Sequence, residues 1–160
     1  MNRIGMGYDS HRLVSGRPLI LGGLQIEHDL GLAGHSDADA VLHAITDAIL
    51  GAIAAGDIGE LFPDTDPQWA GADSQVFLRR AVSLAAQSGC RVVNCDVTII
   101  AQQPKLSPYK PQMQASIAKA LGVDTAAVSV KAKTNEGMDA IGRGEGIAVM
   151  AAVLLTTETL

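Results

Sequence analysis

Asp9, His11 and His43 are the residues whose types and spacing favour metal chemistry in this sequence of 160 residues. From Arg3 to His11 the side chains alternate with the period of a β-strand, so Asp9 and His11 project from the same face. With His43 from a distant segment they supply one carboxylate and two imidazoles. This set suits tetrahedral zinc with an open fourth position, and non-haem iron uses the same ligands. Exposed or capping roles are the competing interpretation.

Other polar residues lie near these candidate ligands in the sequence. His35 precedes Ser36, whose hydroxyl is predicted to cap a long helix, so both would lie where free helix-terminal N–H groups attract anions. An ordinary turn would explain His35 equally well. Along the helix, Asp39, His43 and Asp47 recur every four residues and share one face. Asp47 is therefore a candidate hydrogen-bond acceptor for His43.

The second half of the sequence carries groups suited to phosphate. Residues 134–137 (TNEG) and 142–146 (GRGEG) are rich in glycine, which lets backbone amides approach an anion. Residues 1–73 hold 11 carboxylates and 3 basic side chains, whereas residues 74–160 hold 6 and 9. Lys105, Lys133 and Arg143 are in the basic half. A Gly-rich turn is commonly only a turn, so this pattern indicates phosphate only in combination with a metal site.

The elements that must position these residues can be predicted from periodicity and turn signals. In chain order they are strands at 3–11, 19–21 and 24–27, a helix from Ser36 with Val41, Leu42, Ile45, Ile49 and Ile53 as its core stripe, a functional loop at 56–73, a helix from 73 or 74 to about 89, a strand at 92–101, a helix ending near 121, and strands at 128–132 and 146–156. The last strand is a near-continuous aliphatic run and is expected to be buried on both faces.

Composition narrows the class of protein. The length, with 48% hydrophobic and 18% charged residues, predicts one globular domain over residues 1–160. A net charge of −5 without a run of Lys or Arg argues against nucleic acid as a partner. We find no signal or transit segment and no apolar stretch long enough to span a membrane. With Cys90 and Cys95 expected to be reduced, a cytoplasmic protein without a membrane partner is predicted.

Motifs along nearly the whole chain point to a known family. They are residues 5–11 (GMGYDSH), 35–39 (HSDAD), 56–59 (GDIG), 61–66 (LFPDTD), 96–101 (DVTIIA), 104–105 (PK) and 142–146 (GRGEG). In their content and order the sequence resembles the 2-C-methyl-D-erythritol 2,4-cyclodiphosphate synthases of the non-mevalonate isoprenoid pathway.

The resemblance implies an α/β subunit of the α+β type, with a mixed β-sheet and helices packed on one face. It implies a homotrimer whose sheets face the threefold interior and whose active sites lie between neighbouring subunits. It also implies a phosphorus–oxygen lyase. In that reaction the 2-phosphate of 4-diphosphocytidyl-2-C-methyl-D-erythritol 2-phosphate attacks the β-phosphorus of the same molecule, forming the cyclic diphosphate and releasing CMP. Such a site must bend the substrate and neutralise charge on the transferring phosphoryl group.

The resemblance further assigns roles to residues. It implies zinc on Asp9, His11 and His43, and a second divalent cation, Mg²⁺ or Mn²⁺, on Glu136 with the substrate phosphates. His35 and Thr134 match catalytic positions. The implied substrate-binding residues are Asp9, Ser10, His11, His35, Ser36, Asp57, Ile58, Gly59, Phe62, Pro63, Asp64, Thr65, Asp66, Ala101, Gln102, Gln103, Pro104, Lys105, Leu106, Ser107, Lys133, Thr134, Asn135, Glu136, Ala140 and Arg143.

Within this set the resemblance separates several regions. Residues 57–59 and 62–66 are implied to line the methylerythritol part, residues 101–107 to receive cytosine largely through backbone groups, and residues 133–136 to follow the diphosphate. Arg143 and Glu145 would lie near the trimer axis, beside a cavity proposed for an isoprenoid diphosphate. The chain departs from the common family pattern at three positions. Family members commonly carry small or hydroxyl residues where this chain has Lys133 and Asn135, and a larger apolar residue where it has Ala140.

Two other functions compete with the cyclising lyase. A zinc hydrolase of nucleotide diphosphates would use the same ligands but activate water. A trimeric small-molecule sensor would hold a structural metal, with the Gly-rich segments only shaping a cleft.

Overall fold

A five-stranded mixed sheet is the scaffold of the computed structural model, which describes residues 1–157. Its strands are β1 (Asn2–Ser15), β4 (Leu30–Leu32), β5 (Cys90–Ile100), β6 (Val128–Lys133) and β7 (Gly146–Thr157). They lie in the order β4-β1-β7-β5-β6, and each neighbouring pair is antiparallel except β5 and β6, which are parallel. The predicted mixed sheet is confirmed.

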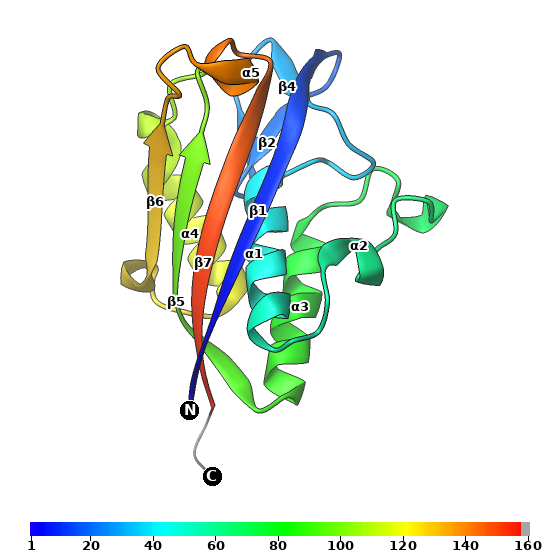
Figure 1. The fold of residues 1–160 in the computed structure, drawn as a ribbon, viewed down its shortest axis with the longest axis vertical. Helices are drawn as coiled ribbons and strands as arrows, with labels where there is room; N and C mark the ends of the chain where they lie inside the picture. The colour runs from blue at the N-terminus through cyan, green and yellow to red at the C-terminus, as the bar shows by residue number, and fades with distance from the viewer. Residues whose placement is uncertain (158–160) are drawn as a thin grey trace.

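The helices are α1 (Ala40–Ala52), α2 (Ile58–Leu61), α3 (Gln75–Gln87), α4 (Lys110–Leu121) and α5 (Asp139–Gly142). Short 3-10 helices follow at Pro67–Trp69, Ser107–Tyr109 and Thr125–Ala127. Figure 1 shows α1, α3 and α4 together on one face of the sheet, as predicted, with α2 and β6 on opposite sides of the molecule. Among the described residues, none of these helices has the length and apolar character needed to cross a membrane.

A separate hairpin, β2 (Leu19–Leu21) with β3 (Leu24–Ile26), lies where the sequence predicted it. Its turn is Gly22-Gly23, and both residues have positive φ values, +62° and +77°. Glycine adopts this left-handed conformation without the steric cost that a Cβ atom brings, so two adjacent glycines suit a two-residue hairpin turn. The strand β4 and the helices α2 and α5 were not predicted.

Strand β1 and helix α1 pack closely enough to bring their polar residues together. A Cβ atom on Gly5 or Gly7 would overlap the backbone carbonyl oxygen of Ala48 or Ala44, respectively. The absence of side chains at these two positions lets the helix lie directly on the strand. Residues further along the same face of β1 therefore reach the first turns of α1, which places Asp9 and His11 beside His43.

Helix α1 begins at Ala40 rather than at Ser36, so the predicted helix start is wrong. Its N-cap is Asp39, whose fully buried carboxylate accepts from two N–H groups of the first turn at 3.1 Å. The same carboxylate accepts from Gly22 N at 2.9 Å and Gly23 N at 2.6 Å. Burial raises the pKa of Asp39, and these backbone donors oppose the shift. An aspartate that caps a helix and also anchors a hairpin turn explains why the helix starts here.

Residues 146–149 of the last strand are buried on both faces within the described chain, but Met150 and Ala152 are exposed, which corrects the prediction for the rest of residues 146–156. In β7, Met150 is 49% exposed, and in the neighbouring β1, Ile4, Met6 and Tyr8 are 77%, 78% and 56% exposed. The reason is architectural, because the helices cover only the opposite face. We call the apolar surface formed by Ile4, Met6, Tyr8, Met150 and Ala152 the outer sheet face.

Candidate metal centre and substrate pockets

Three side chains from β1 and α1 converge on one point. Asp9 Oδ2 lies 2.8 Å from His11 Nε2 and 3.0 Å from His43 Nδ1, and the two imidazole nitrogens are 3.4 Å apart. Taking one ligand atom from each residue, these atoms all lie within 4.8 Å of one another. Asp9, His11 and His43 therefore form a group able to hold a metal ion, as the sequence predicted.

The far side of the His11 ring is fixed by the backbone. His11 Nδ1 lies 2.6 Å from the carbonyl oxygen of Ala33, which can only accept a hydrogen bond. The proton is therefore on Nδ1, and Nε2 is left to face Asp9 and His43. An imidazole whose outer N–H donates to a carbonyl group is the usual arrangement of a histidine metal ligand.

The pKa values of this group reflect burial and mutual hydrogen bonding. Burial alone would raise the pKa of Asp9, but the hydrogen bonds with His11 and His43 and the positive charge of these rings together outweigh burial and hold the pKa well below the ordinary 3.8. Burial would lower the pKa of His11, but the hydrogen bond with Asp9, the negative charge of Asp9 and the hydrogen bond to the Ala33 carbonyl together outweigh burial and raise the pKa above 6.5. Asp9 is consequently ionised at neutral pH, the state in which a carboxylate binds a metal.

Asp47 does not play the role suggested by its spacing. Its Oδ1 accepts from the backbone N–H of Ile58 at 2.7 Å, whereas the outer nitrogen of His43, Nε2, contacts Ser74 Oγ at 2.8 Å and Ser36 Oγ at 3.2 Å. Burial raises the pKa of Asp47, opposed by its backbone hydrogen bond. Asp47 therefore joins α1 to the start of α2, and the hydroxyl partners of His43 were not predicted.

The candidate ligands lie in a cavity of about 430 Å³, which we call the metal pocket. It is lined by Asp9, His11, Gly34, His35, Ser36, His43, Ile58, Gly59, Phe62, Pro63, Asp64, Trp69 and Phe77. Most of the residues predicted for the polyol are present. Asp57 instead caps α2 by accepting from Glu60 N at 2.9 Å, and the carbonyl oxygen of Asp66 lies 3.1 Å from His35 Nε2. Asp57, Thr65 and Asp66 do not themselves line the cavity.

Two aromatic residues that line the metal pocket, Trp69 and Phe77, were not predicted from the sequence. Phe77 and Phe62 have ring centroids 4.6 Å apart, and Trp69 meets Phe62 edge-on at 5.2 Å with an interplanar angle of 88°. Phe77 also lies 6.0 Å from the His43 ring. Trp69 lies in the predicted functional loop, which was a usable signal. Phe77 lies on a helix, where an aromatic residue is indistinguishable from ordinary core.

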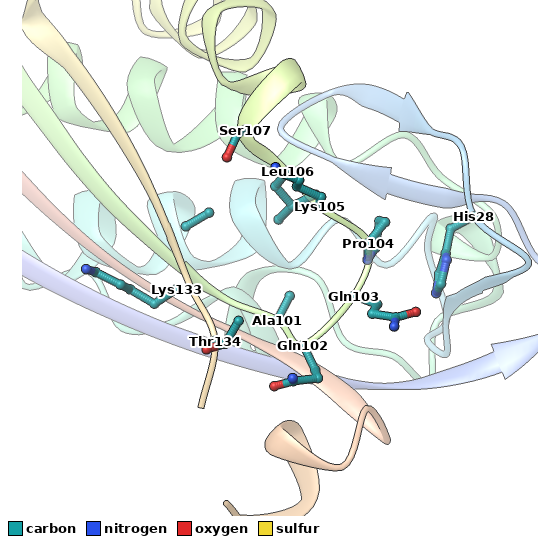
Figure 2. A pocket seen from close by; sticks show the side chains of 11 residues that line it. His28, Ala101, Gln102, Gln103, Pro104, Lys105, Leu106, Ser107, Lys133 and Thr134 are labelled. Atoms are coloured by element: carbon teal, nitrogen blue, oxygen red, sulfur yellow. The ribbon is translucent and has the colours of Figure 1, made fainter. Parts of the chain in front are cut away.

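A second cavity, of about 490 Å³, is formed around the segment 101–107, and we call it the loop pocket. It is lined by His28, Ala101, Gln102, Gln103, Pro104, Lys105, Leu106, Ser107, Ala132, Lys133 and Thr134. Figure 2 shows His28 beside Pro104 and Gln103 at one end and Lys133 at the other, with Ala101, Gln102 and Thr134 between them. The backbone joins the two walls, because Ala101 N donates to the carbonyl oxygen of Lys133 at 2.9 Å. His28, from the connection between β3 and β4, was not predicted.

The remaining predicted residues surround the end of β6 and the start of β7. Thr134 Oγ1 donates to Glu136 Oε1 at 3.0 Å, and Asn135 Nδ2 donates to Asp139 Oδ2 at 2.7 Å. Ser10 and Ala140 line a small cavity of about 170 Å³. Arg143 Nε donates to Glu145 Oε1 at 2.7 Å, with both side chains largely exposed.

The metal pocket and the loop pocket have no lining residue in common within the described chain. The two predicted catalytic residues are divided between them, since His35 lines the first and Thr134 the second. Within one chain, the candidate metal ligands therefore lie in the same pocket as residues from the segments 57–59 and 62–66. The segment 101–107, expected to receive cytosine, lines a different pocket.

The fold and the site define a class: small mixed α/β proteins in which a strand and a helix present an Asp-His-His metal group. Comparison with known proteins narrows it. Residues 2–156 match the YgbB family. A relative named 2-C-methyl-D-erythritol 2,4-cyclodiphosphate synthase, from Dechloromonas aromatica, is 58% identical over 96% of this chain and 96% of its own length. The chain therefore belongs to the YgbB family, and the resemblance to these synthases, which are lyases, is confirmed.

Solved structures agree with this assignment. A CDP-bound 2C-methyl-D-erythritol-2,4-cyclodiphosphate synthase matches with a TM-score of 0.89 and 42% identity over 96% of this chain and 100% of that chain. The bifunctional IspDF from Campylobacter jejuni matches with a TM-score of 0.95 and 43% identity over 99% of this chain. This chain spans 43% of the length of the bifunctional protein.

Proposed function

We propose that this chain cyclises 4-diphosphocytidyl-2-C-methyl-D-erythritol 2-phosphate to 2-C-methyl-D-erythritol 2,4-cyclodiphosphate, with release of CMP, as a single domain over residues 1–160. The observation that carries the proposal is the Asp9-His11-His43 group at the metal pocket of a YgbB-family chain. A similar synthase has been solved with CDP, which contains the nucleotide part of the proposed substrate. The cytoplasmic location and the absence of nucleic-acid and membrane partners remain predictions.

Zinc fits the three residues on chemical grounds. One carboxylate and two imidazoles are common zinc ligands, and the outer N–H of His11 is already directed to a carbonyl oxygen. When bound, a zinc ion at this position would polarise phosphoryl oxygens and offset the negative charge that develops in the transition state. Asp9, His11 and His43 would hold it, leaving its remaining position to the substrate.

The chain's own residues would act by positioning, because no protein nucleophile is needed. An oxygen of the 2-phosphate forms the new bond to the β-phosphorus. The bond from that phosphorus to the oxygen bridging to the α-phosphate breaks, and its electron pair leaves with CMP. His35 and Ser36 would bind the 2-phosphate at the metal pocket, while segments 57–59 and 62–66 hold the polyol in a bent conformation. Such pre-orientation supplies much of the rate enhancement of an intramolecular reaction.

Thr134 and Glu136 are the proposed residues on the diphosphate. Thr134 already donates to Glu136, so the hydroxyl and the carboxylate lie side by side at the end of β6. Glu136 would provide one carboxylate oxygen to a second divalent cation, Mg²⁺ or Mn²⁺, with the substrate phosphates as its other ligands. Lys133 and Arg143 would add positive charge, and Ser10, Asn135 and Ala140 would complete this region.

The cytidine would bind in the loop pocket. The lining segment 101–107 presents backbone N–H and C=O groups, and these can distinguish the amide and amine pattern of a pyrimidine without special side chains. Lys105 at the loop and Lys133 opposite it provide charge for the adjoining phosphates.

A homotrimer is part of this proposal. The outer sheet face exposes five apolar positions from β1 and β7, which is the surface a subunit interface would cover. Assembly would also allow the metal pocket of one subunit and the loop pocket of its neighbour to face the same substrate molecule. An isoprenoid diphosphate near Arg143 and Glu145 is the further ligand that such an assembly would accommodate at its axis.

Product analysis tests the reaction. The zinc-loaded protein is incubated with the linear substrate, and products are identified by phosphorus NMR and chromatography. The proposal expects the cyclic diphosphate and CMP in equal amounts. Linear products alongside CMP, with no cyclic diphosphate, would instead establish the hydrolase.

Metal removal separates the enzyme from a sensor. Dialysis against a chelator is expected to abolish CMP release, and readdition of zinc to restore it. If CMP release is undiminished while the melting temperature falls, the metal is structural and the lyase mechanism fails.

A further inference from the structure

The outer nitrogen of His43 faces a serine that the metal pocket does not include. His43 Nε2 lies 2.8 Å from Ser74 Oγ, on the side of the ring away from Asp9. Ser74 is fully buried and immediately precedes α3. Although it occupies the N-cap position, its side chain makes no capping hydrogen bond to that helix. The Ser74 hydroxyl therefore contacts His43 instead of capping α3.

The direction of each hydrogen bond can be assigned from donor and acceptor chemistry. Ser74 Oγ donates a hydrogen bond to Asp37 Oδ1, since a carboxylate can only accept, so the single hydroxyl proton points to Asp37. Ser74 Oγ must then accept from His43 Nε2–H. In its neutral, metal-binding form, with its one proton on Nε2, the His43 ring presents the lone pair of Nδ1 toward the point where the candidate ligand atoms meet.

Asp37 is itself held from several sides. Its backbone N–H donates to the carbonyl oxygen of Ala72 at 3.0 Å, and its Oδ2 accepts from Ser74 N at 3.2 Å. Its Oδ1 also accepts from Asp39 N at 3.2 Å. These contacts join the turn before α1 to the turn before α3. The carboxylate therefore has a fixed place behind Ser74, and a hydrogen-bonded chain runs from Asp37 through Ser74 to His43.

We propose that Asp37 and Ser74 are positioning residues that fix the tautomer and the orientation of His43 for metal binding. The inference rests on the proposed function, because it takes Asp9, His11 and His43 as the zinc ligands. Partners in this position restrict rotation of the ring and make the ligating nitrogen more basic. Neither residue lines the metal pocket, so their effect on the substrate is expected to pass through His43.

The two histidines of the site differ in a way that makes the inference testable. His11 is fixed by the backbone carbonyl of Ala33, which no substitution removes, whereas His43 is fixed by a side chain. Ser74→Ala deletes the nearer acceptor of His43 Nε2–H with little change in volume and leaves only Ser36 Oγ, at 3.2 Å. Asp37→Asn keeps an oxygen that can still accept from Ser74, so its effect should have the same direction and be smaller.

The test measures zinc affinity directly, using zinc alone as the probe and a chromophoric chelator as competitor, on the full-length protein. Ser74→Ala is expected to raise the zinc Kd by about 10- to 100-fold. The matched control is Asp73→Ala, because Asp73 Oδ1 accepts from Gln75 N at 2.8 Å in the first turn of α3 but does not contact His43. That variant is expected to lower the melting temperature while leaving the zinc Kd unchanged.

Nitrogen NMR of the zinc-loaded protein provides a readout that a general loss of stability would not produce. In the unchanged protein the Nε2–H proton of His43 should exchange slowly with water, and in Ser74→Ala it should exchange rapidly. If Ser74→Ala does not fold, Asp37→Asn provides both measurements.

The outcomes separate this inference from the proposed metal site. If His43→Ala loses zinc but Ser74→Ala and Asp37→Asn bind it normally, the positioning role is wrong and the metal site stands. If Asp73→Ala and Ser74→Ala weaken zinc binding equally, the effect is due to the stability of α3, and the positioning role is also wrong. If His43→Ala binds zinc as tightly as the unchanged protein, the ligand assignment itself fails.

Discussion

The metal pocket and the loop pocket are built from different parts of the polypeptide. At the metal pocket the candidate ligands contact one another through side chains, and His43 also contacts the neighbouring Ser74; a backbone carbonyl, that of Ala33, fixes only the outer nitrogen of His11. In the loop pocket the principal link between the two walls is a backbone hydrogen bond from Ala101 to Lys133. Among the described residues, the side-chain oxygen of Gln102 there is buried without a hydrogen-bond partner. One pocket depends on residue types and the other on the path of the chain.

This difference indicates in which pocket a single side-chain substitution should abolish function. A pocket organised by side chains loses its function when one side chain is removed, because the others remain as unpaired buried polar groups. A pocket organised by backbone groups tolerates most side-chain substitutions and responds mainly to changes in chain path. The predictions below test that contrast, beginning with the largest expected effect.

His43→Ala should break the metal pocket and leave the loop pocket intact. We expect the rate of cyclisation to fall by roughly 10³-fold or more, about 4 kcal/mol of transition-state stabilisation, because the third metal ligand is lost. CMP, as a probe of the loop pocket, should bind with unchanged affinity. Turnover and calorimetric titration with CMP measure the two effects. Full activity with no metal in the purified variant would contradict the ligand assignment.

Met6→Glu should separate the two pockets without damaging either. Met6 is 78% exposed on the outer sheet face, so the charge is tolerated in an isolated chain but not at a subunit interface. We expect sedimentation to show dissociation, activity to fall by at least about 10²-fold through lost positioning, and zinc to remain bound.

The control for this prediction is Val76→Glu, on α3. Val76 is 39% exposed and lies on the helical side of the sheet, so the variant should keep the assembly and most of the activity. A fully active Met6→Glu monomer would contradict the assignment of the two pockets to neighbouring subunits.

Acidification should weaken the metal pocket selectively. Metal binding requires neutral imidazoles, and the raised pKa of His11 means that protons compete with zinc above the ordinary value of 6.5. In the metal-free protein the pH dependence of stability has the opposite sign. The ion pair with Asp9 contributes stability that is complete below 6.5, is lost as pH rises through the pKa of His11, and is lost in acid only as Asp9 is protonated, below its ordinary 3.8.

Melting temperatures with zinc and with a chelator, measured between about pH 5.5 and 8.5, check this sign. The increase caused by zinc should become larger as pH rises, by a few degrees or more. His11→Ala should remove most of this pH dependence. A zinc effect that is constant across the range would show that His11 does not exchange its proton for the metal.

The same contrast explains what the sequence predicted. The shared face of Asp9 and His11 followed from strand periodicity, whereas residue type alone offered His43, on a distant helix, only as a candidate third ligand, which the family resemblance then implied. Spacing failed for Asp47, since the four-residue rule gives the face of a helix but not the partner that another segment supplies. The backbone N–H of Ile58 is that partner, and Ile58 begins α2, a short helix that periodicity did not predict.

The fold was predictable to a similar degree. The strand and helix order followed from alternation and turn signals, and the hairpin at Gly22-Gly23 was found in place. The start of α1 was not, because Asp39 is chosen as its cap by a tertiary contact with that hairpin. The exposure of Met150 and Ala152 in β7 was not predicted either. An aliphatic run indicates that a strand must be covered, but it does not indicate which part of the protein covers it.

The smallest expected effect belongs to the loop pocket. Gln103→Ala removes a side chain that lines it, yet we expect the affinity for CMP to change by less than about threefold, since the proposed recognition of the base uses backbone groups. His28→Ala, beside Pro104, should weaken CMP binding more than Gln103→Ala, because the imidazole ring offers a face on which the base can stack. Calorimetric titration of both variants with CMP measures this. A loss of a hundredfold or more at Gln103 would show that the loop pocket, like the metal pocket, is organised by its side chains.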